Sequence, residues 1–245
     1  MKKLYDKDET WFAVIWIIIY VVGTSVANNV SESIGVPYLI TLILATAILT
    51  VLLIFIKKNG LTEKCGLCKF SGSYKGFLFF IPIIAICSVN FWNGLVITTS
   101  VGECALEAVA KGLAGMVEEL VFRGLLFVGM CKTNVKSAVI VSSLTFGIGH
   151  IVNLINGAAV FETVCQIIYA VAIGFCFTVV FKTGKSLIPC IIAHIVVNAS
   201  SAFGAVTSDM QTFYIIVTVF LTVVSVGYAV YLSVRYKDKL MEKVA

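Results

Sequence analysis

The sequence predicts an all-α polytopic membrane protein, a bundle of about eight transmembrane helices with both termini in the cytoplasm. Composition is the first observation: 60% of the 245 residues are hydrophobic and 13% are charged, whereas about 25% of a soluble domain is charged. The second is a series of long apolar stretches, and the third is the placement of Lys and Arg between them. No polar linker divides the chain, so we expect one membrane domain over residues 1–245.

Eight apolar stretches are candidates for transmembrane helices. A bilayer core about 30 Å thick requires roughly 20 apolar residues in each helix. The predicted spans are residues 11–30, 37–56, 77–97, 104–130, 137–155, 159–181, 187–203 and 212–234. The fourth is the least apolar, because Glu103, Glu107 and Lys111 lie near its start, and the seventh is short.

Basic residues alternate from loop to loop, which supports this helix count. Lys and Arg accumulate in cytoplasmic loops, and 16 of the 18 fall on one side of the membrane if the chain crosses it eight times. These are Lys2, Lys3, Lys7, Lys57, Lys58, Lys64, Lys69, Lys75, Lys132, Lys136, Lys182, Lys185, Arg235, Lys237, Lys239 and Lys243. The opposite loops contain none, so the net charge of +5 reports membrane orientation and does not indicate a nucleic-acid partner.

A cleaved signal peptide is an alternative for the first span. Lys2 and Lys3 would then form its basic segment, and the sequence around Ala27 would be the cleavage site. The acidic residues at positions 6, 8 and 9 are atypical for such a segment, and cleavage would break the charge alternation. We therefore expect this span to remain as a helix.

The eight cysteines show no disulfide or metal pattern. Six lie in or at the ends of predicted helices, where a thiol behaves as a small hydrophobe. Cys65 and Cys68 form a C-x-x-C in the lysine-rich loop, but a structural zinc site needs four ligands and no second pair is near. We expect both thiols to be reduced in a cytoplasmic loop.

Five ionisable residues lie at membrane depth, where each is costly and therefore a functional candidate. They are Glu118, Glu119 and Arg123 on the fourth span, His150 on the fifth and His194 on the seventh, and they include both histidines of the chain. Glu119 and Arg123 are four residues apart, so they can pair on one helix face. Glu118 is rotated by about 100° from Glu119, which leaves its carboxylate facing the bundle.

Depth brings three of these groups together. Counted at 1.5 Å per residue from the cytoplasmic helix ends, Glu118, His150 and His194 all lie near the membrane midplane or in its cytoplasmic half, so one cavity can hold them. Asn198 projects from the same helix face as His194. Buried polar contacts between helices are the simpler interpretation of each group taken singly. Together, they favour a hydrolytic site with Glu118 as the general base on a water molecule.

Three motifs carry a family resemblance. E-E-x-x-x-R (Glu118, Glu119, Arg123), F-x-x-x-H (Phe146, His150) and H-x-x-x-N (His194, Asn198) occur in this order within residues 118–198. This block resembles the CAAX protease and bacteriocin-processing family, also called the Abi family of intramembrane proteases, which includes the Rce-type prenyl-protein endopeptidases.

The resemblance implies a role for each matched residue. Glu118, helped by His150, would activate the attacking water. His194 and Asn198 would stabilise the oxyanion, and the Glu119–Arg123 pair would shape the site.

Metal dependence is open at this stage. Glu118, His150 and His194 form a plausible zinc set with an open water position, and a glutamate-activated water without metal needs the same residues. The sequence has no H-E-x-x-H helix of the kind found in common zinc proteases, so the metal-free scheme is slightly favoured.

We expect a cavity that opens towards the cytoplasm and accepts a lipid-anchored or membrane-associated peptide or protein. Few Arg among many Lys, Ile and Val residues hint at a bacterial cell-membrane protein, for which a peptide or small membrane protein is the better substrate. Peptide maturation and self-immunity against bacteriocins are roles found in the family. A catalytically inactive peptide-binding immunity protein and, with less support, a transporter are the alternatives.

Overall fold

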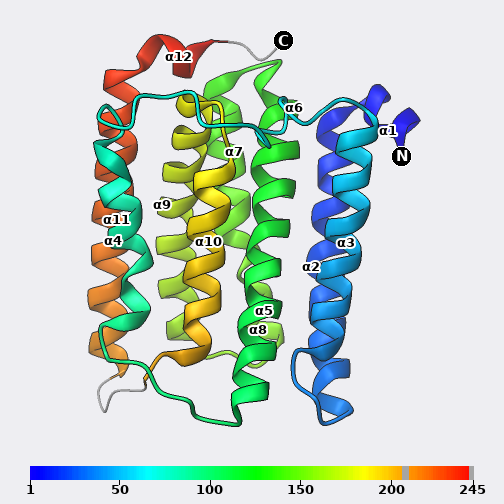
Figure 1. The fold of residues 1–245 in the computed structure, drawn as a ribbon, viewed down its shortest axis with the longest axis vertical. Coiled ribbons are helices and arrows are strands. Elements are labelled where there is room, and N and C mark those ends of the chain that lie inside the picture. Colours follow the sequence, from blue (N-terminus) through cyan, green and yellow to red (C-terminus); the bar gives the residue numbers. More distant parts are fainter. Residues whose placement is uncertain (206–209, 243–245) are drawn as a thin grey trace.

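The computed structural model describes residues 1–205 and 210–242, and these residues form helices joined by short connections. The one β-type contact among them is an isolated bridge between Leu95 and Gly204. The helices run roughly parallel or antiparallel to a common axis (Figure 1). The predicted all-α class is therefore confirmed for the described part of the chain.

The helices have the following bounds in chain order. They are α1 (Lys2–Lys7), α2 (Glu9–Ser33), α3 (Leu39–Lys58), η1 (Leu78–Phe80), α4 (Ile81–Cys87), η2 (Val89–Phe91), α5 (Val101–Glu118), η3 (Glu119–Phe127), α6 (Val128–Cys131), α7 (Val135–Gly149), α8 (Val152–Ile155), α9 (Val160–Gly184), α10 (Ile188–Ser200), η4 (Ser201–Phe203), α11 (Met210–Arg235) and α12 (Lys237–Met241). The segments α5, η3 and α6 follow one another without a break, and η3 is π-helical.

Each predicted span overlaps a helix, but the third is shorter than predicted. It was expected over residues 77–97, whereas helical structure ends at Phe91. The chain then leaves the helix because Leu95 bridges to Gly204. The same span begins with a left-handed turn in which Leu78, Phe79 and Phe80 have φ angles of 52°, 51° and 59°.

Within the described residues, five helical stretches are long and apolar enough to cross a membrane. They are Glu9–Ser33, Leu39–Lys58, Val135–Ile155, Val160–Gly184 and Met210–Arg235. The helices around α4 and α10 are shorter, and the run from α5 to α6 contains several charged residues. The chain therefore has several membrane-spanning helices, whereas the total of eight such helices stays a prediction.

Local sequence fixes where several helices begin. The Asp8 side chain accepts a hydrogen bond from Trp11 N at the start of α2, and Asn134 does the same for Ser137 N at the start of α7. Ser100 and Glu103 form a reciprocal capping box at the start of α5. Such caps satisfy backbone N–H groups that have no partner inside the helix.

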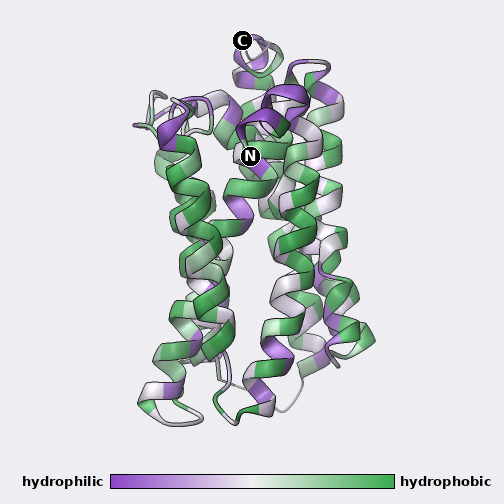
Figure 2. Cartoon of the chain, turned by 90° about the vertical axis from the view of Figure 1, so that its right-hand side faces the viewer, coloured by the Kyte–Doolittle hydropathy of each residue, from purple (hydrophilic) through white to green (hydrophobic). Residues whose placement is uncertain are grey.

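The two ends of the bundle differ in charge. The N-terminus, α12 and the lysine-containing loop of residues 59–77 lie at one end (Figure 1), which we call the basic end. The loops of residues 34–38, 93–100 and 156–159 lie at the other, which we call the distal end, and contain no Lys or Arg. Hydrophobic residues cover the middle of the helices between these ends (Figure 2). Which end faces the cytoplasm remains a prediction from the lysines.

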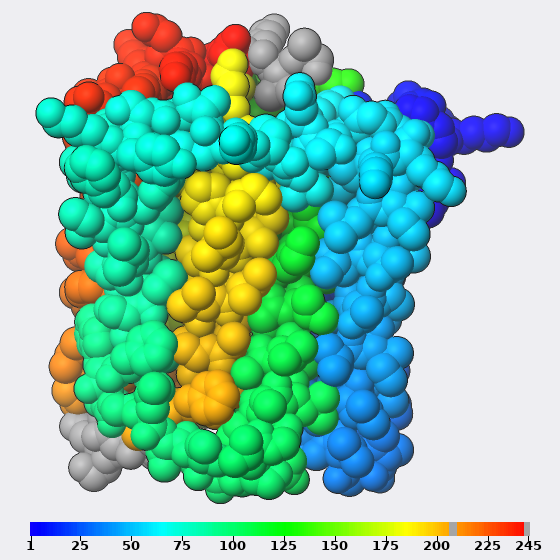
Figure 3. All heavy atoms as spheres, in the orientation of Figure 1, coloured from blue at the N-terminus to red at the C-terminus, as the bar shows by residue number. Residues whose placement is uncertain are grey.

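Helix packing places the fourth predicted span at the centre. The pair α2 and α3 packs against α5 and η3, α10 packs along α5, and α9 lies between α7 and α11. On the face shown in Figure 3, α10 lies between α4 and α5 beneath the loop of residues 59–77. Gly147 allows α7 to approach α9 closely, because a Cβ atom there would lie 2.3 Å from Val171 Cγ2.

Candidate active site

The two adjacent carboxylates sit where α5 becomes the π-helical η3, a type of segment that is frequent at functional sites. Glu119 and Arg123 form the predicted i, i+4 ion pair, with 2.8 Å between Arg123 Nη1 and Glu119 Oε1, and both side chains are 0% exposed. Glu118 is rotated away from this pair, and its side chain is 14% exposed. The two neighbours therefore differ: Glu119 is sealed in the core, whereas Glu118 is accessible.

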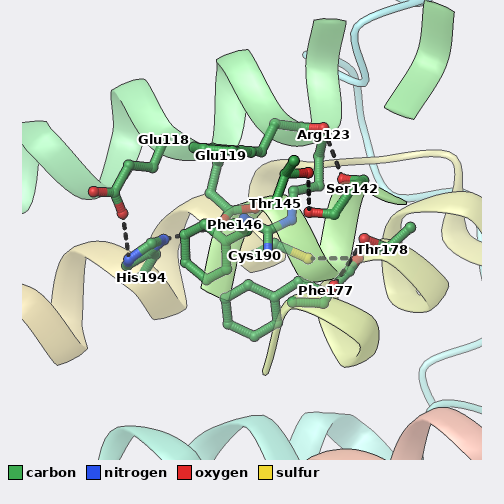
Figure 4. A network of polar contacts seen from close by, with 12 residues as sticks. Glu118, Glu119, Arg123, Ser142, Thr145, Phe146, Phe177, Thr178, Cys190 and His194 are labelled. Atoms are coloured by element: carbon green, nitrogen blue, oxygen red, sulfur yellow. Dashed lines mark hydrogen bonds and ion pairs between the residues drawn. The ribbon is translucent and has the colours of Figure 1, made fainter. Parts of the chain in front are cut away.

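His194 from α10 links the two carboxylates (Figure 4). Its Nδ1 atom lies 2.8 Å from Glu119 Oε1, and its Nε2 atom lies 3.2 Å from Glu118 Oε2. Only a doubly protonated imidazole presents an N–H to both acids. With His194 and Arg123 positive, the charges of the two glutamates are balanced, as a buried charged cluster requires. The sequence predicted that His194 lies near Glu118, but it did not predict the contact between His194 and Glu119.

Phe146 from α7 is the apolar centre of the cluster. Its ring centroid lies 4.1 Å from Arg123 Cζ, a cation–π distance. The same ring packs edge-on against His150 and His194, at centroid separations of 5.2 and 5.7 Å. Arg123 Nε and Nη2 are buried without a hydrogen-bond partner in the described structure, so the aromatic face is the main further support for this guanidinium.

His150 follows the last residue of α7 and has one ring nitrogen engaged. Its Nδ1 atom lies 3.1 Å from the carbonyl oxygen of Phe146. A carbonyl oxygen only accepts, so Nδ1 carries the proton of this hydrogen bond. In the neutral ring, Nε2 is then an acceptor without a proton.

Glu118 and His150 line one cavity of about 100 Å³. Tyr20 from α2 also lines it and donates a hydrogen bond of 2.6 Å to Glu118 Oε1. Tyr20 is not among the residues predicted from the sequence, because a tyrosine in an apolar helix carries no signal by itself. Tyr20, Thr24 and Asn28 recur at intervals of four, and this polar stripe on the first span would have been the available clue.

Asn198 lies beside His194 but does not belong to the described lining of the cavity. Its Nδ2 atom donates to the backbone oxygen of Lys111 at 3.2 Å. The side chain thus ties α10 to α5 in this structure. The oxyanion role implied for Asn198 by the resemblance remains a prediction.

The cavity does not open towards the basic end, where the sequence analysis placed its mouth. Its lining continues from Tyr20 to Asn28 on α2 and from His150 to Asn156 beside α8, and both runs lead to the distal end. On the other side of Glu118, buried side chains fill the core, among them Leu126, Phe127 and Phe177. The expectation failed because it considered three helices only, whereas α2 forms one wall.

The predicted zinc ligands are not arranged as a metal site. In the described part of the chain, no three His, Cys, Asp or Glu side chains are grouped so that they could hold a metal ion. Both ring nitrogens of His194 face carboxylates, and His150 Nδ1 faces a carbonyl. These residues therefore do not fit the suggested zinc ion. Cys65 and Cys68 of the C-x-x-C are not joined by a disulfide, since all eight cysteines are free. The Cys68 Sγ atom contacts the carbonyl oxygen of Lys185.

Comparison with protein families gives a match that covers the site. Residues 100–200 match the family model described as type II CAAX prenyl endopeptidase Rce1-like. A search of curated proteins found no match. The matched region runs from Ser100 through α10, so it includes Glu118, His150, His194 and Asn198, while Tyr20 lies outside it. Over residues 100–200, the chain is therefore similar to the CAAX protease family in its Rce1-like form.

Proposed function

We propose that the protein is an intramembrane endopeptidase that hydrolyses a peptide bond in a membrane-associated or lipid-modified peptide or protein. One observation carries this proposal: the accessible Glu118 carboxylate shares a cavity with His150 and contacts His194 on its other side. A water-activating base and a positively charged donor therefore meet at one place. The family match to residues 100–200 supports the same activity.

Activation of water is assigned to Glu118 and His150. A water molecule between them can donate one hydrogen to the Glu118 carboxylate and the other to His150 Nε2, which the Phe146 carbonyl leaves as an acceptor. As the water oxygen bonds to the substrate carbonyl carbon, Glu118 takes its proton. No metal-bound water is needed in this scheme.

Stabilisation of the intermediate is assigned to His194. Its protonated ring faces Glu118 through Nε2, and once Glu118 has taken the proton of the water this positive N–H is released to donate to the substrate oxygen as it becomes negative. Collapse of the intermediate breaks the C–N bond, and the proton held by Glu118 passes to the leaving nitrogen. Asn198 positions the helix of His194 through its bond to Lys111, and the Glu119–Arg123 pair holds the opposite face of the ring.

For the biological role, we propose a class of substrate and not a particular substrate. A bacterial cell membrane, suggested by the composition, favours a peptide or small membrane protein as the substrate. Maturation of a bacteriocin-like peptide or immunity towards one fits such a substrate. A catalytically inactive immunity protein that only binds the peptide is the alternative that the following experiment separates.

Replacement of Glu118 by Gln tests the proposal, since the amide keeps the shape of the side chain and lacks the base. Membranes with the wild-type protein, Glu118→Gln or Glu103→Gln would be compared by mass spectrometry of newly formed peptide termini. Glu103 is a matched control, because it lies on the same helix but caps its exposed start. We expect equal protein abundance, with new termini for wild type and Glu103→Gln only. Unchanged cleavage by Glu118→Gln would refute the mechanism, and a phenotype that persists without cleavage would support peptide binding alone.

A further inference from the structure

A second cavity of about 250 Å³ continues from the catalytic cavity to the distal end. The two cavities share three lining residues, Asn28, Asn153 and Asn156. We call the second one the distal trough. Its lining is Asn28, Asn29, Glu32, Pro37, Tyr38, Asn153, Asn156 and Ala158. Because the lining is shared, the trough is a polar path between Glu118 and the surface.

The length of this path suits a short extended peptide. Tyr20, which contacts Glu118, and Glu32, which lines the trough, are twelve residues apart on α2. At 1.5 Å per residue this is about 18 Å along the helix. An extended chain rises about 3.4 Å per residue, so roughly five residues fit between the mouth and the reacting bond.

The three shared asparagines are held in place and still have unpaired polar atoms. Asn28 Oδ1 accepts from Thr41 at 2.5 Å, Asn156 Oδ1 accepts from Ser25 at 2.6 Å, and Asn153 Nδ2 donates to Gln166 at 2.8 Å. Within residues 1–205 and 210–242, Asn28 Nδ2, Asn156 Nδ2 and Asn153 Oδ1 have no hydrogen-bond partner. Two donors and one acceptor on fixed side chains complement the C=O and N–H groups of a peptide backbone.

Charge at the mouth adds a preference. Glu32 lines the trough and is exposed, and it has no cationic partner among the described residues. Lys111, the lysine nearest this end of α5, is already paired with Glu107 at 2.6 Å. A basic side chain of the ligand is therefore the natural counter-ion for Glu32.

We propose that the distal trough binds an extended peptide segment of the substrate, with a basic side chain beside Glu32, and that the chain reaches Glu118 from the distal end. This inference rests on the proposed endopeptidase function for its link to cleavage. Binding itself is a separate property, so it can be measured without turnover. If the lysines mark the cytoplasmic side, the substrate comes from the opposite side of the membrane.

Equilibrium binding on the inactive Glu118→Gln background tests the trough. The probe is a set of fluorescent, extended decapeptides with Lys or Glu at each position, and the full-length protein is held in lipid nanodiscs. We expect Asn153→Leu and Asn156→Leu each to weaken binding by about tenfold, because each removes one hydrogen bond to the peptide. Glu32→Gln should remove the preference for Lys. Asn59→Leu, an asparagine at the basic end, is the control and should bind like the parent.

The outcomes separate the two proposals. The proposal that the trough binds a peptide would be wrong if the decapeptides bound the parent and both asparagine variants with equal affinity, or did not bind at all. If the trough variants lose binding while the wild type cleaves no peptide and forms no new termini, the trough stands and the endopeptidase function fails. If cleavage depends on Glu118 but the KM for the peptide is the same in wild type, Asn153→Leu and Asn156→Leu, the endopeptidase function is supported and the trough proposal is wrong.

The direction of entry has its own measurement. Asn156→Cys and Asn59→Cys would be treated with a membrane-impermeant maleimide in intact cells and in inside-out vesicles, with the parent chain as the background for its native cysteines. We expect Asn156→Cys to be modified in intact cells and Asn59→Cys in vesicles. Modification of Asn156→Cys in vesicles only would overturn entry from outside.

Discussion

The two sides of Glu118 form a contrast between a closed and an open polar region. Towards the basic end, Glu119, Arg123 and His194 pack against aromatic rings and, together with Glu118 itself, make a charge-balanced cluster. Towards the distal end, polar amides and hydroxyls line connected cavities. Both regions contain buried or half-buried polar groups, but only the first satisfies its charges internally.

This difference shows how one carboxylate can be both rigid and reactive. Tyr20 contacts one oxygen of Glu118 and His194 the other, so the group is held on both sides. The sealed cluster fixes His194, and the open side supplies access for water and substrate. Precise placement by a packed neighbouring shell is what a catalytic group requires.

The largest expected effect tests the sealed side. Arg123→Leu leaves Glu119 with His194 as its sole cation, and the cluster then has an uncompensated negative charge. Breaking a buried pair by removal of one partner costs about 3–5 kcal/mol. We expect strongly reduced amounts of folded protein in the membrane and a lower midpoint of thermal unfolding in detergent.

Lys2→Leu is the control for Arg123→Leu. Lys2 and Asp6 form an i, i+4 ion pair in which both side chains are about half exposed, and such a pair contributes about 0–1 kcal/mol. This variant should accumulate normally. Normal accumulation of Arg123→Leu as well would show that the cluster is not a stability element.

The second effect separates the two histidines. His150→Ala removes a group on the open side, so we expect normal abundance with turnover lowered by about 10²–10⁴-fold, as for loss of a group that assists proton transfer. His194→Ala removes a cation from the sealed side and should lower both abundance and turnover. Protein amount by immunoblot and cleavage per molecule would be measured together. Identical behaviour of the two variants would remove the distinction between the sides.

The smallest effect concerns the hydrogen bond of Tyr20. Tyr20→Phe keeps the ring and removes the donor to Glu118, and hydrogen bonds to charged groups contribute about 1.5–3 kcal/mol. We expect turnover to fall by about tenfold with little change in abundance. Tyr228→Phe is the matched control, since that buried hydroxyl donates to the Phe77 carbonyl away from the site. Turnover equal to wild type in Tyr20→Phe would show that Glu118 is positioned without α2.

Several features were predictable because they depend on neighbours in sequence. The Glu119–Arg123 pair follows from a spacing of four, and the apolar runs gave helices close to their predicted bounds. The third span ended early because its C-terminal part pairs with Gly204, more than 100 residues away in the chain. Tyr20 was missed for the same kind of reason, as its role arises from contact with Glu118, 98 residues further on.

By itself, the sequence determined the helical class, the basic character of one end and the set of ionisable residues at membrane depth. These follow from hydropathy, charge and helical spacing, which are local. Tertiary structure alone decided that His194 bridges both glutamates, that α2 closes the site and that the cavity leads to the distal end. The rotation and tilt of each helix against its neighbours fix those contacts, and these depend on side-chain packing across the bundle.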